Sequence, residues 1–142
     1  MKRILLAALL LASCTKSGTP DLQISDAWAR ETVAGQTATA AYMSIDNRGA
    51  GDDRLVGVEA AAPARAMLHS SESSGGVSRM REMSAGLALP AGTAVQLKPG
   101  GTHVMITGLD APLRKSEVVK LRLLFEKSGA RDVDVPVGAE GR

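Results

Sequence analysis

Short apolar or alternating runs, separated by glycine and proline, follow one another along the chain from Leu22 onward. The alternation is clearest in residues 118–126, where Lys120 and Arg122 occupy every second position between apolar residues. Such alternation is typical of a strand with one face in the core. The same pattern predicts strands at residues 22–27, 38–47, 54–60, 66–69, 77–81, 94–97, 103–107, 118–126 and 131–136.

Segments rich in glycine, proline, asparagine or serine separate these runs. They predict turns or loops at residues 47–52, 73–76 and 89–92. After the N-terminal segment, no run combines a helical period of roughly 3.6 residues with helix-capping residues. Many short strands at this spacing predict an all-β fold, a sandwich with Greek-key connections.

The N-terminal segment has a different pattern. Lys2 and Arg3 precede an apolar run over residues 4–12, which is too short to span a bilayer that needs about 20 residues. The run ends in Leu-Ala-Ser-Cys14, which resembles the lipobox of bacterial lipoproteins. We therefore predict a lipoprotein signal peptide over residues 1–13 and a lipidated Cys14 that anchors the mature protein to a membrane. The alternatives are a free cysteine in an ordinary signal peptide and an uncleaved anchor.

The predicted organisation places the protein in the cell envelope, facing the periplasm. Thr15 rather than aspartate follows Cys14, which for a Gram-negative lipoprotein resembles an outer-membrane address. The predicted segments are a signal peptide at 1–13, a tether at 14–20, a β-sandwich domain at 21–137 and a short tail at 138–142.

Composition narrows the classes of partner and chemistry. The chain has 17 basic and 15 acidic residues. Removal of Lys2 and Arg3 with the signal peptide would make the two numbers equal, so the mature chain is close to neutral. It has one Trp, one Tyr and one Phe and no basic patch, so nucleic acid is not expected as a partner. Cys14 is the single cysteine, which excludes a disulfide or thiolate metal site within the domain.

Candidate chemistry lies with the histidines and methionines. The chain has only two histidines, His69 and His103, and each has a methionine two positions away, at Met67 and Met105. Residues two apart on a strand share a face. Met80 lies between the two pairs. Imidazole and thioether together favour Cu(I) and suit Zn(II), Mg(II) or Ca(II) poorly.

Taken singly, each of these residues is weak evidence, because a methionine in a β-sandwich usually fills the core. The combination is more specific, since no Asp or Glu accompanies it to build a hard-metal or hydrolytic site. A neutral ligand set leaves the positive charge of Cu(I) uncompensated. That keeps the affinity moderate and favours release to an anionic thiolate, which is the chemistry of a carrier.

The spacing of these residues resembles the periplasmic copper chaperones of the PCu(A)C type. Their pattern is His or Met, ten residues, Met, about twenty-one residues, then His-x-Met. Ten residues separate His69 from Met80, and twenty-two separate Met80 from His103. The extra residue is predicted to be an insertion in a loop at residues 84–86. The resemblance also includes residues 24–28, 41–43, 53–58, 89–92 and 97–101, so it covers nearly the whole mature chain.

The resemblance implies a cupredoxin-like β-sandwich that binds one Cu(I) per chain near the surface. Carried over residue by residue, the ligands are His69, Met80, His103 and Met105, with Met67 as a substitute. The resemblance also implies delivery of copper towards the dinuclear copper centre of cytochrome c oxidase, with subunit II or another assembly chaperone as the partner. Some members have a tail rich in His and Met for a second copper. Residues 137–142 contain neither.

Three alternatives compete with this interpretation. A blue-copper electron carrier needs a thiolate beside two histidines, which the domain lacks. An enzyme is not expected, since no nucleophile-elbow motif or triad is evident. The alternative of a different class is a β-sandwich lipoprotein that binds an envelope partner without metal, its methionines only packing. Within the copper interpretation, sequestration for tolerance is the alternative to delivery.

Other residues near these motifs are predicted to have structural roles. Met43 is expected to pack in the core, and Met83 to lie in the core or a loop. Trp28 is expected to be a core residue and not a shield over the metal. Arg79 and Arg81 flank Met80, and solvated side chains are favoured over contacts with an acidic acceptor.

Overall fold

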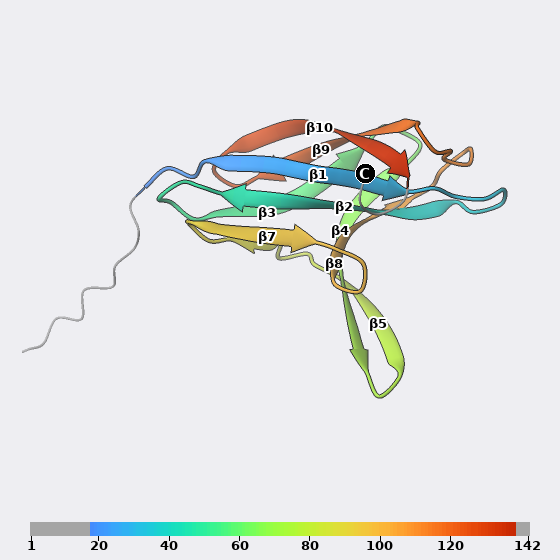
Figure 1. Ribbon diagram of the computed structural model, residues 1–142, viewed down its shortest axis with the longest axis horizontal. Coiled ribbons are helices and arrows are strands. Elements are labelled where there is room, and N and C mark those ends of the chain that lie inside the picture. The colour runs from blue at the N-terminus through green and yellow to red at the C-terminus, as the bar shows by residue number, and fades with distance from the viewer. Residues whose placement is uncertain (1–17, 139–142) are drawn as a thin grey trace, which may run out of the picture.

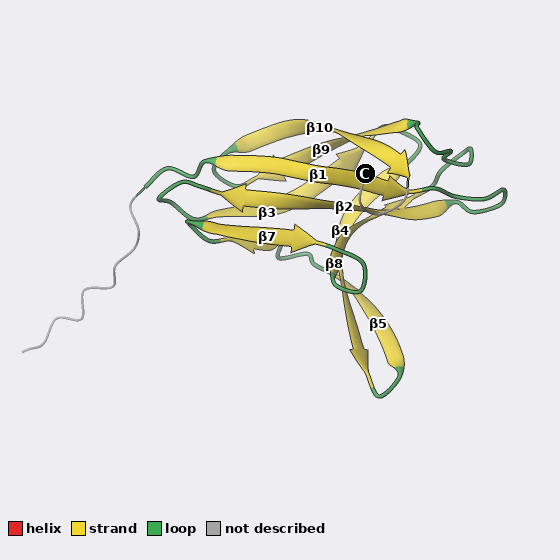
Figure 2. Ribbon diagram, viewed as in Figure 1, coloured by secondary structure: helices red, strands yellow, loops and turns green. Residues whose placement is uncertain are grey.

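The computed structural model describes residues 18–138 (Figure 1). The predicted signal peptide, Cys14 and the last four residues lie outside the described residues. Residues 18–138 contain ten strands and no helix, and hence none that could cross a membrane (Figure 2). The strands are β1 (Leu22–Arg30), β2 (Ala38–Asn47), β3 (Asp53–Ala60), β4 (Arg65–Ser74), β5 (Val77–Glu82), β6 (Leu87–Leu89), β7 (Thr93–Leu97), β8 (Thr102–Thr107), β9 (Val118–Phe125) and β10 (Gly129–Gly138).

The predicted all-β architecture is confirmed, and all nine predicted strands are present. Two details differ. β4 continues to Ser74, because its polar second half pairs with β5 and does not need an apolar face. β6 was not predicted; its three residues pair with β3 and end at Leu89, at the edge of the predicted 89–92 turn.

The strands form one hydrogen-bonded sheet in the order β5-β4-β8-β2-β1-β10-β9-β3-β6, with β7 also paired to β2. Neighbours are antiparallel except β1 and β10, which pair in parallel at Ala29 and Val137. This sheet folds over into two layers around one core. Fully buried side chains from both layers meet there, among them Ile45, Val104 and Leu123.

Alternation along β9 follows the prediction. Leu121 and Leu123 are buried, whereas Lys120 and Arg122 are exposed. The two cations pair across the sheet with Asp134 and Asp132 of β10, at 2.8 and 2.7 Å. Exposed pairs of this kind add little stability, so the buried leucines are the main stabilising contribution of the strand.

β2 changes partner along its length. Residues 38–41 pair with β8, and residues 43–47 pair with β7. β7 and β8 therefore lie end to end along β2, joined by the turn at residues 98–101. The amide of Lys98 donates to the carbonyl of Thr102 at 2.9 Å, and Gly100 has a φ of +77° that favours glycine. This turn lies next to the candidate site.

Asn47 ends β2 and is completely buried. Its side-chain oxygen accepts hydrogen bonds from the amides of Asp21 and Gly49, at 3.2 and 3.1 Å. Its nitrogen donates to the carbonyls of Gly51 and Leu89, both at 2.9 Å. The side chain of Asn47 thus connects the residue before β1, the β2–β3 loop and β6 to one another.

Asp53 begins β3 and is 5% exposed. Burial by itself raises the pKa of its carboxyl, but hydrogen bonds outweigh that effect and hold the pKa below the usual 3.8. The donors are the hydroxyl of Ser128 and the amides of Lys127, Arg54 and Ser128. The charged carboxylate therefore anchors the β9–β10 turn to β3.

The lowered pKa makes this anchor dependent on pH. A group with a lowered pKa stabilises the folded state above its unfolded pKa, and the stabilisation is lost as pH falls through the folded value. We expect Asp53→Asn to lower the free energy of unfolding at neutral pH by about 1 kcal/mol or more. The difference from the parent should shrink below pH 3.8. Denaturant unfolding at several pH values measures it.

Asp132→Asn is the control, because Asp132 is exposed and paired only on the surface, so its effect on unfolding at neutral pH should be small. A difference between the parent and Asp53→Asn that stayed constant from pH 7 to about pH 2 would contradict the role of the charge.

Candidate metal centre

The register of β4 and β8 places the two histidines opposite each other. His69 pairs with His103, and Met67 pairs with Met105. Leu68, between Met67 and His69, is buried in the core, so its two neighbours lie on the other face of the sheet. The imidazole centroids are 6.0 Å apart, and the rings are inclined at 65°. Antiparallel pairing thus brings together histidines that are far apart in sequence.

His103 is held in one orientation. It is 4% exposed, and its Nδ1 lies 3.0 Å from the carbonyl oxygen of Gly101. A carbonyl can only accept, so Nδ1 carries the hydrogen, and Nε2 keeps its lone pair in the neutral ring. The same carbonyl accepts from the amide of Ser71 at 3.1 Å. The turn before β8 therefore fixes the tautomer that leaves Nε2 available as a ligand.

His69 has an unsatisfied nitrogen. Its Nδ1 is buried and has no hydrogen-bond partner among the described residues. A buried polar atom without a partner is unfavourable and needs an explanation, and binding of an ion is one such explanation. A metal ion bound by this nitrogen would remove the deficit. The histidine pair thus fits a metal on an observation independent of the sequence motif.

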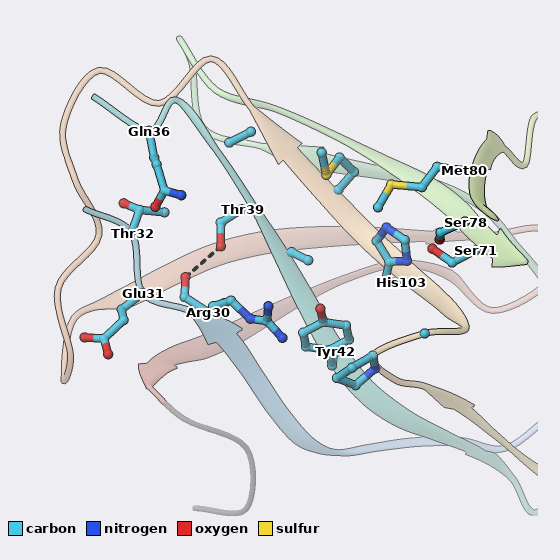
Figure 3. Close-up of a pocket in the computed structure, with 15 residues that line it drawn as sticks. Arg30, Glu31, Thr32, Gln36, Thr39, Tyr42, Ser71, Ser78, Met80 and His103 are labelled. Atoms are coloured by element: carbon cyan, nitrogen blue, oxygen red, sulfur yellow. Dashed lines mark hydrogen bonds between the residues drawn. The ribbon is translucent and has the colours of Figure 1, made fainter. Parts of the chain in front are cut away.

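Met80 comes from a different kind of element. β4 and β5 form a hairpin that extends from the body of the sandwich (Figure 1), and every residue of β5 is exposed. Met80 pairs with Ser71, which is two residues from His69 and therefore on the same face of β4. Its side chain is 59% exposed and lies next to the ring of His103 (Figure 3).

A pocket of about 360 Å³ opens at this face (Figure 3). Met80, His103 and Met105 are among the residues that line it. Met80 and His103 lie at one end, and Arg30, Gln36 and Thr39 lie at the other (Figure 3). Neither His69 nor Met67 lines the pocket. The structure thus brings all four candidate ligands to one face, three of them around the pocket and His69 beside His103.

Two aromatic residues extend the row of rings. The Tyr42 ring centroid is 6.3 Å from that of His103, and the Trp28 centroid is 4.6 Å from that of Tyr42. Tyr42 is buried and lines the pocket, a position that the sequence analysis missed. Its alternation with Ala40 on a strand that pairs with β8 was the signal that could have found it. Trp28 is only partly buried and packs on Tyr42, so the prediction of a core position for it was wrong.

The remaining methionines behave as predicted. Met43 is 2% exposed and belongs to the core. Met83 lies in the loop after β5 and packs against the core. Residues 84–86, the predicted site of the extra residue, lie in the same loop.

The available donors restrict the kind of metal. Within residues 18–138, no group of three or more histidine, cysteine or carboxylate side chains is arranged to hold a metal ion. The thioethers of Met80 and Met105 are the soft donors that line the pocket beside the histidine pair. Such a set suits a soft ion such as Cu(I).

Comparisons with known proteins identify the family of this chain. A family model described as LpqE-like, a lipoprotein family, matches residues 22–137. A protein named as a lipoprotein, Lxx21020 of Leifsonia xyli subsp. xyli, is 35% identical over 116 residues, which cover 82% of this chain and 69% of that protein.

Two similar solved structures are copper-bound proteins. The copper-bound PCuAC domain from PmoF2 is 26% identical, with a TM-score of 0.65, over 83% of this chain and 92% of that one. CuI-DR1885 from Deinococcus radiodurans is 30% identical, with a TM-score of 0.60, over 84% and 82%. The resemblance to the PCu(A)C type and the cupredoxin-like fold are thereby confirmed. The chain belongs to the LpqE-like lipoprotein family.

Proposed function

We propose that this protein is a cell-envelope lipoprotein that binds one Cu(I) ion per chain and passes it to a copper-accepting protein. The observation that carries the proposal is the cross-strand pair of His69 and His103, with a buried unpaired nitrogen on one ring and an oriented Nε2 on the other. The relatives support it, because PCuAC domains and DR1885 have been solved with copper bound.

The proposed ligands are His69, His103, Met80 and Met105. His103 and Met105 come from β8, His69 comes from β4, and Met80 comes from the hairpin strand β5. The two imidazoles supply borderline nitrogen donors and the two thioethers supply soft sulfur. Met80 pairs with Ser71, which is two residues from His69 but four from Met67. Met67 is thus further than His69 from Met80, and we propose it as a packing residue.

The neutral ligands explain why the protein would act as a carrier. They leave the charge of the ion uncompensated, so an anionic thiolate binds Cu(I) more favourably than they do. We propose delivery towards the dinuclear copper centre of cytochrome c oxidase, to subunit II or to another assembly chaperone. In this proposal Cys14 carries the lipid, the domain faces the periplasm, and no catalytic reaction is involved.

An anaerobic titration tests copper binding. The protein, purified from membranes in detergent, is titrated with Cu(I) in competition with a chromogenic chelator, and the product is examined by copper X-ray absorption. We expect one equivalent to bind, with both nitrogen and sulfur scattering. Failure to compete with the chelator would leave the alternative of a metal-free lipoprotein that binds an envelope partner.

Delivery and sequestration are separated by a second step. The copper-loaded protein is mixed with an apo domain that carries the dinuclear copper site of an oxidase subunit II, and copper is measured on each after separation. We expect copper to move to the acceptor. Retention of copper by the protein would favour sequestration for tolerance.

A further inference from the structure

The pocket beside the proposed copper ligands has a second end with a different character. Arg30 and Glu31 both line this end, together with polar or small side chains such as Gln36, Thr39 and Ala38. In Figure 3 the guanidinium extends towards Tyr42, whereas the carboxylate of the adjacent Glu31 points away from it. Among the described residues, no carboxylate forms a salt bridge with Arg30. The pocket thus combines the thioethers of Met80 and Met105 with the guanidinium of Arg30, which forms no salt bridge within residues 18–138.

The strand register explains why these two ends share one space. Ala40 pairs with Met105 of β8, and Arg30 follows Ala29, which pairs with Ala41. Arg30 and Met105 therefore flank Ala40 on neighbouring strands, about 10 Å apart along the sheet. Ala38 and Ala40, which line the pocket beside Arg30 and Met105, have small side chains and leave space above β2.

The backbone of Arg30 is fixed, although its side chain is exposed. Its carbonyl accepts a hydrogen bond from the hydroxyl of Thr39 at 2.7 Å, which ties the end of β1 to β2 (Figure 3). The planar guanidinium presents donors that match a carboxylate in bidentate geometry. The base of the side chain is thus held in place, and its head is available to a ligand in the pocket.

We propose that this pocket receives an acceptor segment in which a thiolate lies beside a carboxylate. The thiolate sulfur approaches the copper end, and the carboxylate pairs with Arg30. This inference rests on the proposed function and assigns the chemistry of its partner. The loaded site and Arg30 are both positive, so an anionic segment is favoured over a neutral one.

The transfer step conserves the oxidation state. Copper remains Cu(I) throughout: a copper–sulfur bond to the acceptor thiolate forms as a bond to a thioether of the protein breaks. The acceptor sulfur enters as a thiolate, so its proton has passed to solvent before the copper–sulfur bond forms. Arg30 acts as a positioning residue, because it holds the acceptor and does not touch the metal.

The first test needs no copper. The apo protein is titrated with N-acetylmethionine and with its amide, which lacks the carboxylate, and the backbone amide signals are followed by NMR. We expect the signals of Ala38 and Ala40 to shift with the carboxylate form, and the shifts to disappear in Arg30→Gln. Equal shifts in Arg30→Gln, or none in the parent, would overturn the inference.

The second test measures transfer from the copper-loaded protein to N-acetylcysteine and to its amide. The ratio of the two rates should fall about fivefold in Arg30→Gln, as expected for one exposed charge pair. Arg30→Lys should recover part of it, because the charge remains but the planar fork is absent. Lys127→Gln removes the same charge from the exposed β9–β10 turn and should keep the parent ratio.

These tests separate the two proposals. Normal copper uptake with an unchanged rate ratio in Arg30→Gln overturns only the role of Arg30. Absence of copper uptake overturns the proposed function, and the NMR titration still decides whether Arg30 recognises a carboxylate.

Discussion

Replacing His103 by alanine is expected to weaken Cu(I) binding by about 100-fold or more while the domain stays folded. Loss of a residue that only supports a ligand already costs 10–100-fold in metal affinity, and His103 is proposed as a ligand itself. Its ring lies on the face opposite the core residue Val104, and the substitution removes its hydrogen bond to the carbonyl of Gly101. Copper affinity by chelator competition and thermal unfolding without copper measure the two effects.

Met67→Leu is the matched control for this prediction. Met67 is on the same face of β4 as His69 and opposite Met105, but it is four residues from Ser71, the partner of Met80. We expect its replacement to leave the copper affinity unchanged. If His103→Ala kept its copper affinity and lost much of its thermal stability without copper, the histidine would be a packing residue. That result would remove His103 from the proposed ligand set.

The second large effect concerns Asn47. Asn47→Asp keeps the size of the side chain but replaces its donating nitrogen by a carboxylate oxygen. This oxygen would face the carbonyls of Gly51 and Leu89, which can only accept. The result is a buried negative charge with one oxygen against two acceptors, although the other oxygen can still accept from the amides of Asp21 and Gly49. We expect a loss of about 3 kcal/mol or more in the free energy of unfolding.

Gln96→Glu serves as the control for Asn47→Asp, because it makes the same change of amide to carboxylate at an exposed position of β7. Its effect should be within about 0.5 kcal/mol. Denaturant unfolding near pH 7 measures both variants. An Asn47→Asp protein as stable as Gln96→Glu would show that the hydrogen bonds of Asn47 contribute little.

Much of the fold could be predicted because its strands alternate. In β9 the buried leucines and exposed cations define the strand from sequence alone. The second half of β4 has no such alternation: Ser70 to Ser74 are all polar, and their pairing with β5 makes them a strand. β6 is a strand because β3 pairs with it, which no local pattern records. Local reasoning therefore failed where pairing alone decides the structure.

The candidate site could be predicted in part for the same reason. The motif named the histidines and methionines, but the pairing of His69 with His103 depends on the register of β4 and β8. Tyr42 and Arg30 come from β2 and β1, and they join the site only through strand neighbours. Trp28 was misplaced because a large aromatic residue is usually buried, whereas here it packs on Tyr42 at a partly exposed position.

The exposed hairpin of β4 and β5 has a consequence for how a loaded protein could be distinguished from an empty one. Three of the proposed ligands belong to the paired body of the sheet, and Met80 belongs to a ribbon whose outer strand is fully exposed. A two-stranded hairpin is only marginally stable by itself. A metal bond to Met80 would therefore link the β4–β5 hairpin to the sandwich and stabilise it there. With these four ligands, copper binding would make β5 less mobile. Amide hydrogen exchange in β5 should therefore be slower in the copper-loaded protein than in the empty one.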